Sequence, residues 1–293
     1  MGWFDKIRAL FSGGEKTDIA VRFELLSEGF VGTMSRFYKA RDRNHDRIVG
    51  LKLCDPEKTA LFESRFAGLK KPSEGAIAIK LKHPRIVETY EYGVSGKGQA
   101  FTVMEFLPGP GLQQLIRQKD KRLVGKRLNL IRQMAEAVHA VHQAGYIHRD
   151  ICPRNFICDP DLDSLKLIDF GLTLPDEPSF RQPGNRTGTP MYMAPEIVRR
   201  RPTDRRVDIF AFGVTAYELL AFQLPWPMAE ATGKGALSHD TAPPVPLLEV
   251  APWVQRNLAA AITDCLAPNR DHRPETMGLL LQRIRRVTDE RET

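Results

Sequence analysis

The chain has 293 residues, of which 42% are hydrophobic and 27% are charged, a composition that excludes a disordered or collagen-like protein. Its formal net charge of +7 favours acidic partners such as nucleotides or phosphorylated proteins. No apolar run is long enough to span a bilayer, and the four cysteines show neither a C-x-x-C pair nor zinc-ligand spacing, so we expect reduced thiols and a cytoplasmic protein.

The first predicted element is a short amphipathic helix in residues 1–11, which residues 12–14 (Ser-Gly-Gly) end. Such a helix packs on its own domain, binds a partner, or makes a weak peripheral contact with a membrane surface. Asp5, Lys6 and Arg8 interrupt its apolar residues, which excludes a signal peptide. The apolar face consists of Trp3, Phe4, Ile7, Leu10 and Phe11.

The next part of the chain is rich in predicted strands. Residues 18–52 alternate in the manner of strands, with turns at 28–29 and 43–45. Residues 59–81 have a helical pattern that Pro72 interrupts. Two further strands are predicted at 86–92 and 100–106.

The remaining two thirds are mostly helical. Apolar residues at helical spacing predict helices over 128–143 and 207–222. Residues 165–168 predict a short buried strand, and the Gly- and Pro-rich stretch 233–246 predicts a loop. A strand-rich part followed by a helical part favours an α+β fold in two lobes.

Two acidic motifs carry the strongest chemical signal. His-Arg-Asp at 148–150 is followed by Asn155, and Asp-Phe-Gly occupies 169–171. Each motif adjoins an apolar stretch that can hold it in place. Carboxylate and amide oxygens suit hard divalent cations, and a phosphoryl group in transfer needs its negative charge neutralised.

These motifs, in this order, resemble those of the eukaryotic-type (Hanks-type) serine/threonine protein kinase family, and the resemblance runs from about Ala20 to Arg286. It implies a bilobal fold, with a small, mostly antiparallel β lobe that carries one main helix and a larger, mostly helical lobe. It also implies ATP, Mg²⁺ (with Mn²⁺ as the alternative ion) and protein substrates, without a nucleic-acid partner. The implied parts are an N-terminal extension (1–18), the β lobe (19–104), a hinge (105–109) and the helical lobe (110–293).

The resemblance also assigns roles to the acidic motifs. Asp150 is implied as the catalytic base that accepts the proton of the substrate hydroxyl. Asn155 and Asp169 are implied as the residues that hold the metal ions bridging the ATP phosphates. Asp208 is implied to hold the catalytic loop from beneath through backbone hydrogen bonds.

Residues 49–52 (Val-Gly-Leu-Lys) resemble the family's Val-Ala-Ile-Lys strand, which implies that Lys52 contacts the α- and β-phosphates. Lys52 then needs a carboxylate partner, which we expect at Glu74, with Glu63 as the alternative. Pro72 and Gly75 flank Glu74, and both are poor residues inside a helix. The alternative is that Pro72 opens a new helix at its first turn, where its missing N–H is tolerated.

The loop that covers the phosphates is less well defined. Gly29 and Gly32 fit the family's G-x-G-x-x-G pattern when Ser27 takes the place of the first glycine. A second register, which ends at Phe37, keeps the usual distance to Lys52 but retains only Gly32. We take both glycines as candidates because backbone amides must approach phosphates closely.

Residues 101–109 resemble the strand and hinge that join the two lobes of the family. Met104 is implied as the gatekeeper beside the adenine pocket. Glu105 and Leu107 are implied to offer backbone hydrogen bonds to the edge of the adenine.

One position departs from the family. Serine/threonine kinases carry a lysine two residues after the catalytic aspartate, where this chain has Cys152. Loss of that charge-assisted hydrogen bond costs roughly 1.5–3 kcal/mol. Arg154 stands where tyrosine kinases carry a compensating arginine, and we predict that Arg154 takes over the lysine's role.

Residues 188–196 (Gly-Thr-Pro-Met-Tyr-Met-Ala-Pro-Glu) resemble the substrate-binding end of a serine/threonine kinase activation segment. Glu196 is implied to pair with Arg273. Arg149 suggests that a phosphate on the activation segment is needed to neutralise its charge. The candidate phosphorylation sites are Thr187, Thr173 and Ser179, with Thr187 preferred because it stands just before Gly188. The alternative is that Arg149 anchors a segment that is already ordered.

Two alternatives remain open at this point. The chain can be a pseudokinase scaffold that binds nucleotide or partners without efficient transfer, because Cys152 and the eroded glycine loop depart from the family. A kinase-like small-molecule phosphotransferase is disfavoured by residues 188–196. The sequence ends soon after the last expected helix, so we expect regulation through partners or residues 1–18, and the arginines at 199–201, 205 and 206 form a basic cluster that either docks an acidic substrate or faces solvent.

Overall fold

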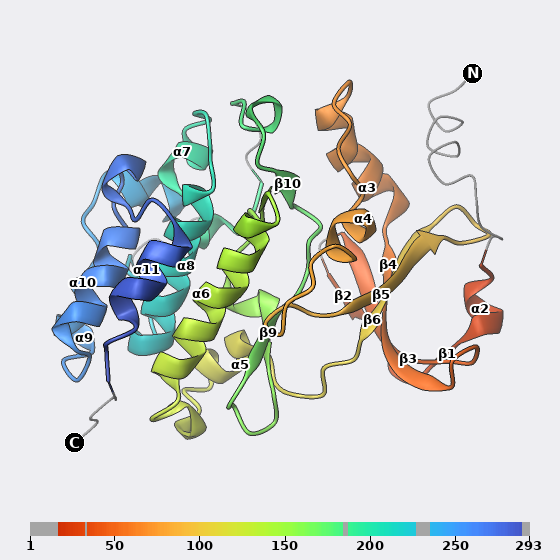
Figure 1. The fold of residues 1–293 in the computed structure, drawn as a ribbon, viewed down its shortest axis with the longest axis horizontal. Helices are drawn as coiled ribbons and strands as arrows, with labels where there is room; N and C mark the ends of the chain where they lie inside the picture. Colours follow the sequence, from red (N-terminus) through yellow and green to blue (C-terminus); the bar gives the residue numbers. More distant parts are fainter. Residues whose placement is uncertain (1–16, 33, 184–186, 227–234, 289–293) are drawn as a thin grey trace. The chain divides into compact units, whose positions relative to one another are not determined.

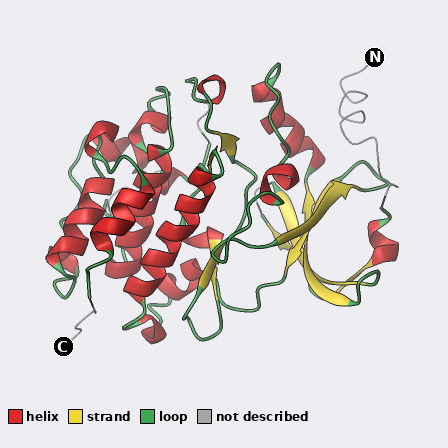
Figure 2. Cartoon of the chain, viewed as in Figure 1, coloured by secondary structure: helices red, strands yellow, loops and turns green. Residues whose placement is uncertain are grey.

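The computed structural model describes residues 17–32, 34–183, 187–226 and 235–288, so the amphipathic segment 1–11 lies outside the described residues. Two compact units make up the chain: Met1–Lys82 with Val87–Leu107, and His83–Ile86 with Pro108–Thr293. Strands dominate the first unit and helices the second (Figures 1 and 2). This confirms the predicted α+β class, with an antiparallel β lobe and a helical lobe. None of the described helices is long and apolar enough to cross a membrane.

The sheet of the first unit is antiparallel, with the order β1-β3-β4-β6-β5 and with β2 paired to β3. Successive side chains of a strand point to opposite faces. On β4, Val49 and Leu51 therefore pack into the apolar core with Phe101 and Val103 of β6, while Lys52 lies on the other face. The strands are β1 (Phe23–Leu25), β2 (Phe30–Val31), β3 (Ser35–Asp42), β4 (Arg47–Cys54), β5 (Thr89–Val94) and β6 (Ala100–Glu105).

Two predictions for the helices of this unit were wrong in detail. The start of the predicted strand region is the short helix α2 (Ile19–Arg22), because the Asp18 carboxylate caps its first N–H groups. The helix predicted over 59–81 is two helices, α3 (Pro56–Glu63) and α4 (Glu74–Ala78), joined by a 3₁₀ turn and an irregular stretch.

A buried ion cluster holds the strands around α2. The guanidinium of Arg22, at the end of α2, donates to both carboxylate oxygens of Asp42 on β3, each at 3.0 Å. It also donates to Glu91 on β5, at 2.8 and 2.7 Å. Asp42 is fully buried, so its charge is stable only because Arg22 and His45 bind it. Burial would raise the pKa of Asp42, but these hydrogen bonds hold the pKa at about 2.

The second unit is built around α8, in which thirteen of sixteen residues are buried, with α6 and α10 packed against it. The helices predicted over 128–143 and 207–222 are confirmed as α6 and α8. The predicted loop 233–246 contains a 3₁₀ helix, Gly235–Asp240. The α-helices are α5 (Leu112–Arg117), α6 (Arg127–Gln143), α7 (Pro195–Val198), α8 (Arg206–Ala221), α9 (Leu247–Val250), α10 (Arg256–Cys265) and α11 (Met277–Ile284).

Short strands of the second unit fix the loops that carry the acidic motifs. They form two separate antiparallel pairs, β7–β10 and β8–β9. The predicted buried strand at 165–168 is confirmed as β9, and it leads directly into the Asp-Phe-Gly motif. These strands are β7 (Tyr146–Ile147), β8 (Phe156–Cys158), β9 (Leu165–Leu167) and β10 (Leu174–Pro175).

Candidate active site

In the first unit, the buried side chain of Lys52 forms an ion pair with Glu74. Glu74 is the first residue of α4, and the Ser73 hydroxyl caps this helix by accepting a hydrogen bond from the Ala76 N–H at 3.3 Å. Pro72 precedes the cap, so its missing N–H removes no helical hydrogen bond. The structure thus gives Lys52 the expected partner, while the alternative, Glu63, ends α3.

Gly75, the second apparent obstacle to a helix here, has a packing role. A Cβ at this position would lie 2.4 Å from the Cβ of Tyr92 on β5, closer than real side chains approach. Glycine therefore lets α4 lie directly against the sheet. The low helix propensity of glycine is offset by this close packing, and it does not prevent Glu74 from reaching Lys52.

The two glycines of the proposed phosphate loop lie in different environments. Gly32 lies at the turn of the β2–β3 hairpin, where its N–H donates to the Ser35 carbonyl at 2.8 Å. Gly29 precedes β2, and a Cβ there would lie 2.5 Å from the Tyr38 ring. Gly29 thus lies outside the turn, and its lack of a side chain allows the close approach of Tyr38. In the β3–β4 ladder Phe37 is opposite Lys52.

Met104 and Gly50 share the face of the sheet that carries Lys52. They are partners in the β4–β6 ladder, and a Cβ at Gly50 would lie 2.7 Å from the Phe37 ring and 3.1 Å from the Met104 Cγ. The Phe37 ring therefore occupies the space that the alanine of the family pattern would need. The division between the two units falls after Leu107, whose backbone groups make no hydrogen bond with the described residues.

In the second unit, Asp208 anchors the catalytic loop as expected. Its carboxylate accepts hydrogen bonds from the backbone N–H groups of His148 and Arg149, both at 2.7 Å, and lies 2.9 Å from His142 Nε2. Full burial would raise the pKa of Asp208, but these hydrogen bonds keep the pKa below its ordinary value. The charged carboxylate can thus hold Arg149 at a φ of 69°, in the left-handed region.

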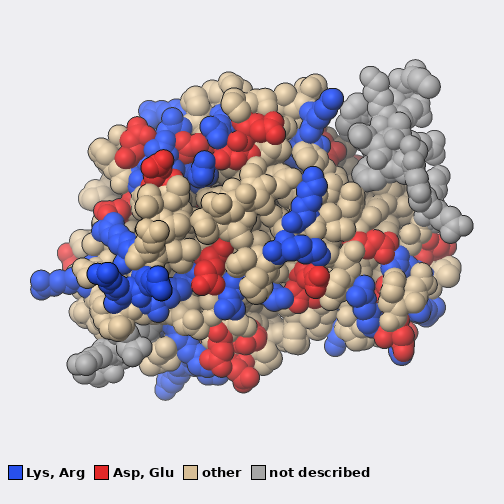
Figure 3. All heavy atoms as spheres, viewed as in Figure 1, with Lys and Arg blue, Asp and Glu red and all other residues tan. Residues whose placement is uncertain are grey.

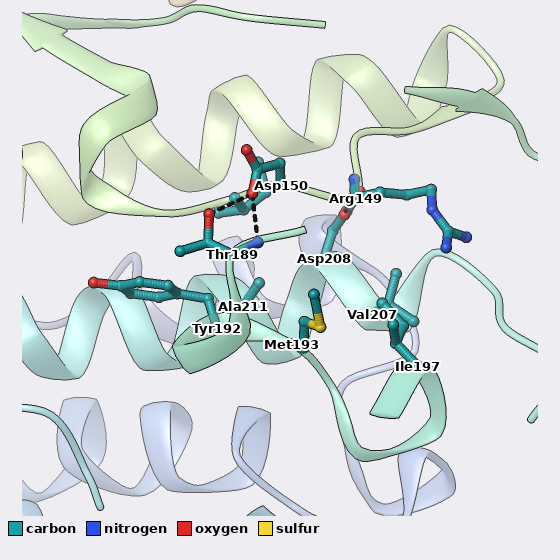
Figure 4. A pocket seen from close by; sticks show the side chains of 10 residues that line it. Arg149, Asp150, Thr189, Tyr192, Met193, Ile197, Val207, Asp208 and Ala211 are labelled. Atoms are coloured by element: carbon teal, nitrogen blue, oxygen red, sulfur yellow. Dashed lines mark hydrogen bonds between the residues drawn. The ribbon is translucent and has the colours of Figure 1, made fainter. Parts of the chain in front are cut away.

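Asp150 is held by hydrogen bonds on both carboxylate oxygens. Oδ1 accepts from the Thr189 N–H at 2.9 Å and from the Thr189 hydroxyl at 2.7 Å (Figure 4). Oδ2 accepts from Arg154 at 2.8 Å and from the Asn155 amide at 3.1 Å. The contact with Thr189 was not predicted, although the Gly-Thr-Pro sequence at 188–190 lies within a recognised motif.

Cys152 does not supply the positive charge of the lysine that it replaces. Its side chain is buried, and burial raises the pKa of the thiol to about 12, so the thiol is neutral near pH 7. Arg154 is partly exposed beside Asp150. Burial lowers the pKa of Arg154, but the charge and hydrogen bond of Asp150 outweigh this and the pKa is raised. Arg154 is therefore a permanent cation within reach of the Asp150 carboxylate.

Asn155 and Asp169 have the donor atoms and the placement that a divalent cation needs. The Asn155 amide nitrogen donates to the Asp150 carbonyl at 2.7 Å, which leaves its oxygen Oδ1 without a donor among the described residues. The Ile168 N–H donates to the Asn155 carbonyl at 2.8 Å, so Asp169 follows directly beside this residue. Asp169 has a φ of 66°, and its Oδ1 accepts from the Gly171 N–H at 3.1 Å.

The described residues contain no group of three or more His, Cys, Asp or Glu side chains that could hold an ion without other ligands. Asn155 and Asp169 offer an amide oxygen and a carboxylate, and Mg²⁺ is commonly bound by one or two carboxylates together with substrate phosphates and water. The residues present thus fit the ion that the resemblance implies.

A buried ion pair holds the end of the activation segment, residues 188–196. Glu196 pairs with Arg273 at 2.7 and 2.9 Å, and both side chains are buried. The cavity in Figure 4, between the catalytic loop and this segment, has a volume of about 10 Å³, which is too small for a substrate group.

Thr173 is fully buried, with its hydroxyl 3.5 Å from the His148 carbonyl, so it was wrong as a candidate phosphorylation site. Ser179 is exposed, whereas the hydroxyl oxygen of Thr187 is buried.

The predicted site residues thus fall into two groups. Lys52, Glu74, Gly32 and Met104 belong to the first unit. The second unit brings together the residues of the acidic motifs and their neighbours, namely Asp150, Arg154, Asn155 and Asp169.

Comparison with known proteins identifies the family. The family model described as "Protein kinase domain" matches residues 28–283. Serine/threonine-protein kinase pkn3 of Myxococcus xanthus is 29% identical over 273 residues, which are 89% of this chain and 49% of that protein. Serine/threonine-protein kinase pkn2 of the same organism is 31% identical, over 87% of this chain and 31% of that protein. Serine/threonine-protein kinase PknB of Mycobacterium leprae is 28% identical, over 91% of this chain and 43% of that protein. The chain spans less than half the length of these curated relatives, and it belongs to the protein kinase domain family, of the Hanks type.

Proposed function

We propose that this protein transfers the γ-phosphoryl group of ATP to serine or threonine hydroxyls of protein substrates. The observation that carries the proposal is the Asp150 carboxylate, which is oriented on one side by Thr189 and on the other by Arg154 and Asn155. The relatives reported above are named serine/threonine-protein kinases, and residues 188–196 are of the serine/threonine type.

The side chains have distinct parts in the reaction. Asp150 accepts the proton of the substrate hydroxyl as its oxygen attacks the γ-phosphorus, and the bond to the bridging oxygen breaks to release ADP. Lys52, held by Glu74, binds the α- and β-phosphates. Arg154 stabilises the negative charge on the transferred group, because Cys152 is neutral.

The nucleotide is bound through both units in this proposal. The N–H groups of the hairpin at Gly32 cover the phosphates, and Gly29 supports that hairpin from outside the turn. The adenine lies beside Met104, with hydrogen bonds to the backbone of Glu105 and Leu107 in the hinge 105–109. Asn155 and Asp169 hold Mg²⁺, or Mn²⁺ in its place, and the ion neutralises phosphate charge when bound.

Regulation and location belong to the same proposal. We place the activation-segment phosphate on Ser179 or Thr187, of which Ser179 is the more accessible here. The four cysteines are free thiols, which suits the reducing cytoplasm. The N-terminal extension is residues 1–18. The hinge 105–109 joins the β lobe, residues 19–104, to the helical lobe, residues 110–293.

A radiolabelled-ATP assay with generic protein substrates and phosphoamino-acid analysis tests this function. We expect labelled phosphoserine or phosphothreonine from the wild-type chain, and a loss of label in Asp150→Asn, since the amide cannot accept the hydroxyl proton. A thermal-shift measurement with Mg-ATP runs in parallel. Nucleotide binding without transfer in the wild type would contradict the proposal and favour the pseudokinase scaffold.

A further inference from the structure

The basic cluster at residues 199–206 is mostly neutralised within the protein. Arg199 binds the Asp240 carboxylate at 2.9 and 2.8 Å. Arg205 lies 3.5 Å from Asp176. Arg206 binds Asp204 at 2.8 Å and Asp271 at 2.8 Å. Only Arg200 and Arg201 of this cluster make no side-chain hydrogen bond or ion pair with the described residues, and both are exposed.

These two arginines differ in their surroundings. Arg201 lines a groove of about 620 Å³ in the second unit, between α7 and the loop before α8 on one side and residues 268–270 on the other. Arg270 lines the same groove and is held there by a hydrogen bond to the Pro202 carbonyl at 3.0 Å. Arg200 is the adjacent residue in the chain but does not line the groove. A volume of this size lies in the range of ligand-binding pockets.

The acidic residues of the groove do not cancel this charge. Glu196 is bound by the fully buried Arg273, and Asp240 by Arg199. The Arg201 charge also contributes to lowering the pKa of Asp240, after the larger effect of the Arg199 hydrogen bond, so Asp240 is ionised and already paired. Arg201 is thus the lining arginine without an ion-pair partner among the described residues, whereas Arg270 lies 3.5 Å from Asp204 and adds a partly neutralised positive charge.

The pairing of the individual arginines distinguishes this groove, and the net charge of the protein does not. On the face drawn in Figure 3, both basic and acidic side chains occur across the surface. A pair of arginines in a concave site is different, because each guanidinium offers several N–H donors in a planar fork that matches a carboxylate. The groove also begins at Pro195 and Glu196, where the proposed substrate-binding segment ends.

We propose that this groove docks an acidic segment of the protein substrate, rich in Asp or Glu and separate from the phosphorylated residue. This inference rests on the proposed function, because it takes the bound protein to be a substrate of the kinase. Binding of the acidic segment itself depends only on the second unit. A carboxylate of the segment pairs with Arg201, the positive charge of Arg270 lies beside it, and the backbone of the segment lies over the prolines of the groove. Charge complementarity of this kind mainly raises the association rate and selectivity, and salt weakens it.

The test measures binding, so that it does not depend on catalysis. A fluorescein-labelled ten-residue peptide rich in Glu, and its counterpart with Gln at the same positions, are titrated with the full chain and followed by fluorescence anisotropy. We expect binding of the Glu peptide and little binding of the Gln peptide. Arg201→Ala should weaken binding of the Glu peptide by about three- to fivefold, the size of a partly exposed ion pair, and Arg201→Glu should abolish it.

Arg200 supplies the matched control. Arg200→Ala and Arg200→Glu make the same charge changes one residue away, also at an exposed side chain, and should alter binding less than about twofold. Equal effects at both positions, or equal binding of the Glu and Gln peptides, would overturn the docking site. A phosphoserine peptide that binds more tightly than the Glu peptide at equal net charge would overturn the assignment to carboxylates.

Repeating the titration in Asp150→Asn separates the two hypotheses. Unchanged peptide binding in this variant is expected, because Asp150 is not part of the groove. If the wild-type chain transfers phosphate but the Glu peptide does not bind, the docking site is wrong and the kinase function stands. If the peptide binds at Arg201 while transfer is absent, the docking surface stands and the proposed function fails.

Discussion

The carboxylate of Asp150 depends on neighbours that come from two different segments of the chain. Arg154 is four residues away in the same loop, whereas Thr189 is 39 residues further on. The short-range contact follows from the motif spacing, so sequence alone suggests it. The long-range contact does not, because a single sequence does not show which residues of the activation segment meet the catalytic loop.

Arg154→Ala should lower the rate of phosphoryl transfer. The change removes a charged hydrogen bond of roughly 1.5–3 kcal/mol, which corresponds to about a tenfold to hundredfold loss in rate. Single-turnover transfer at saturating Mg-ATP measures this effect without the contribution of nucleotide binding.

A lysine restored at its family position provides the control for this prediction. In the Arg154→Ala background, Cys152→Lys should recover part of the lost rate, because it returns a cation to the loop. Undiminished transfer in Arg154→Ala itself would show that Arg154 does not replace the missing lysine.

Single glycines were predicted less well than charged motifs. Gly29 and Gly32 fit the same pattern in the sequence, yet only Gly32 lies at the hairpin turn. Sequence spacing does not reveal that Gly29 is needed for its close approach to Tyr38. Gly75 likewise looked unfavourable from helix propensity, because its contact with Tyr92 arises only in the folded sheet.

At the scale of elements, α4 shows how a short helix positions a functional residue. It has five residues, and Glu74 is its first, so this side chain depends on the cap at Ser73. An isolated helix of this length is unstable without capping and tertiary packing. The sequence pattern suggested one long interrupted helix, with a new helix opening at Pro72 as the alternative, whereas the second helix begins at Glu74 after the cap at Ser73.

Ser73→Ala should therefore affect activity more than global stability. Loss of an N-cap costs about 1 kcal/mol, which here falls on the helix that holds Glu74 against Lys52. We expect a several-fold rise in the KM for ATP with a small change in the midpoint of urea unfolding. Ser73→Asp, which retains a cap, should behave like the wild type, and a Ser73→Asp variant as impaired as Ser73→Ala would contradict this role.

The Arg22–Asp42–Glu91 cluster predicts a pH dependence of stability. The pKa of Asp42 is lowered to about 2 in the folded chain, so its contribution is present above the unfolded pKa near 4 and is lost as the pH falls towards 2. At pH 7, Asp42→Asn should reduce the free energy of unfolding by about 2 kcal/mol.

Urea unfolding of both proteins between pH 7 and pH 2.5 measures this difference. The gap between wild type and Asp42→Asn should narrow as the pH falls below about 4. Asp46→Asn is the matched control, because Asp46 is an exposed member of an ion pair with Arg41 and should contribute little. A gap that stays constant with pH would refute the role of the Asp42 charge.

At the scale of the whole molecule, the change from strands to helices along the sequence predicted the α+β class. Long helices such as α6 were also predictable, because their apolar residues recur at helical spacing over seventeen residues. Short elements were not, since α2 and the 3₁₀ helix at Gly235–Asp240 are too short to show a period. Periodicity also could not predict the boundaries of the two units. His83–Ile86 belongs to the second unit through contacts such as the hydrogen bond from the Leu167 N–H to the Arg85 carbonyl.

The proposed function requires residues of both units to act on one nucleotide. Lys52 belongs to the first unit and Asp169 to the second. If both act on the same phosphates, their contributions to Mg-ATP binding are coupled, whereas independent sites give additive effects.

The most direct measurement is a double-mutant cycle of the Kd for a non-hydrolysable ATP analogue with Mg²⁺, using Lys52→Met, Asp169→Asn and the double variant. We predict that each single change weakens binding and that the double variant is weaker than either by clearly less than the sum of their effects. Additivity within about 0.5 kcal/mol, or unchanged binding in either single variant, would contradict the shared nucleotide site.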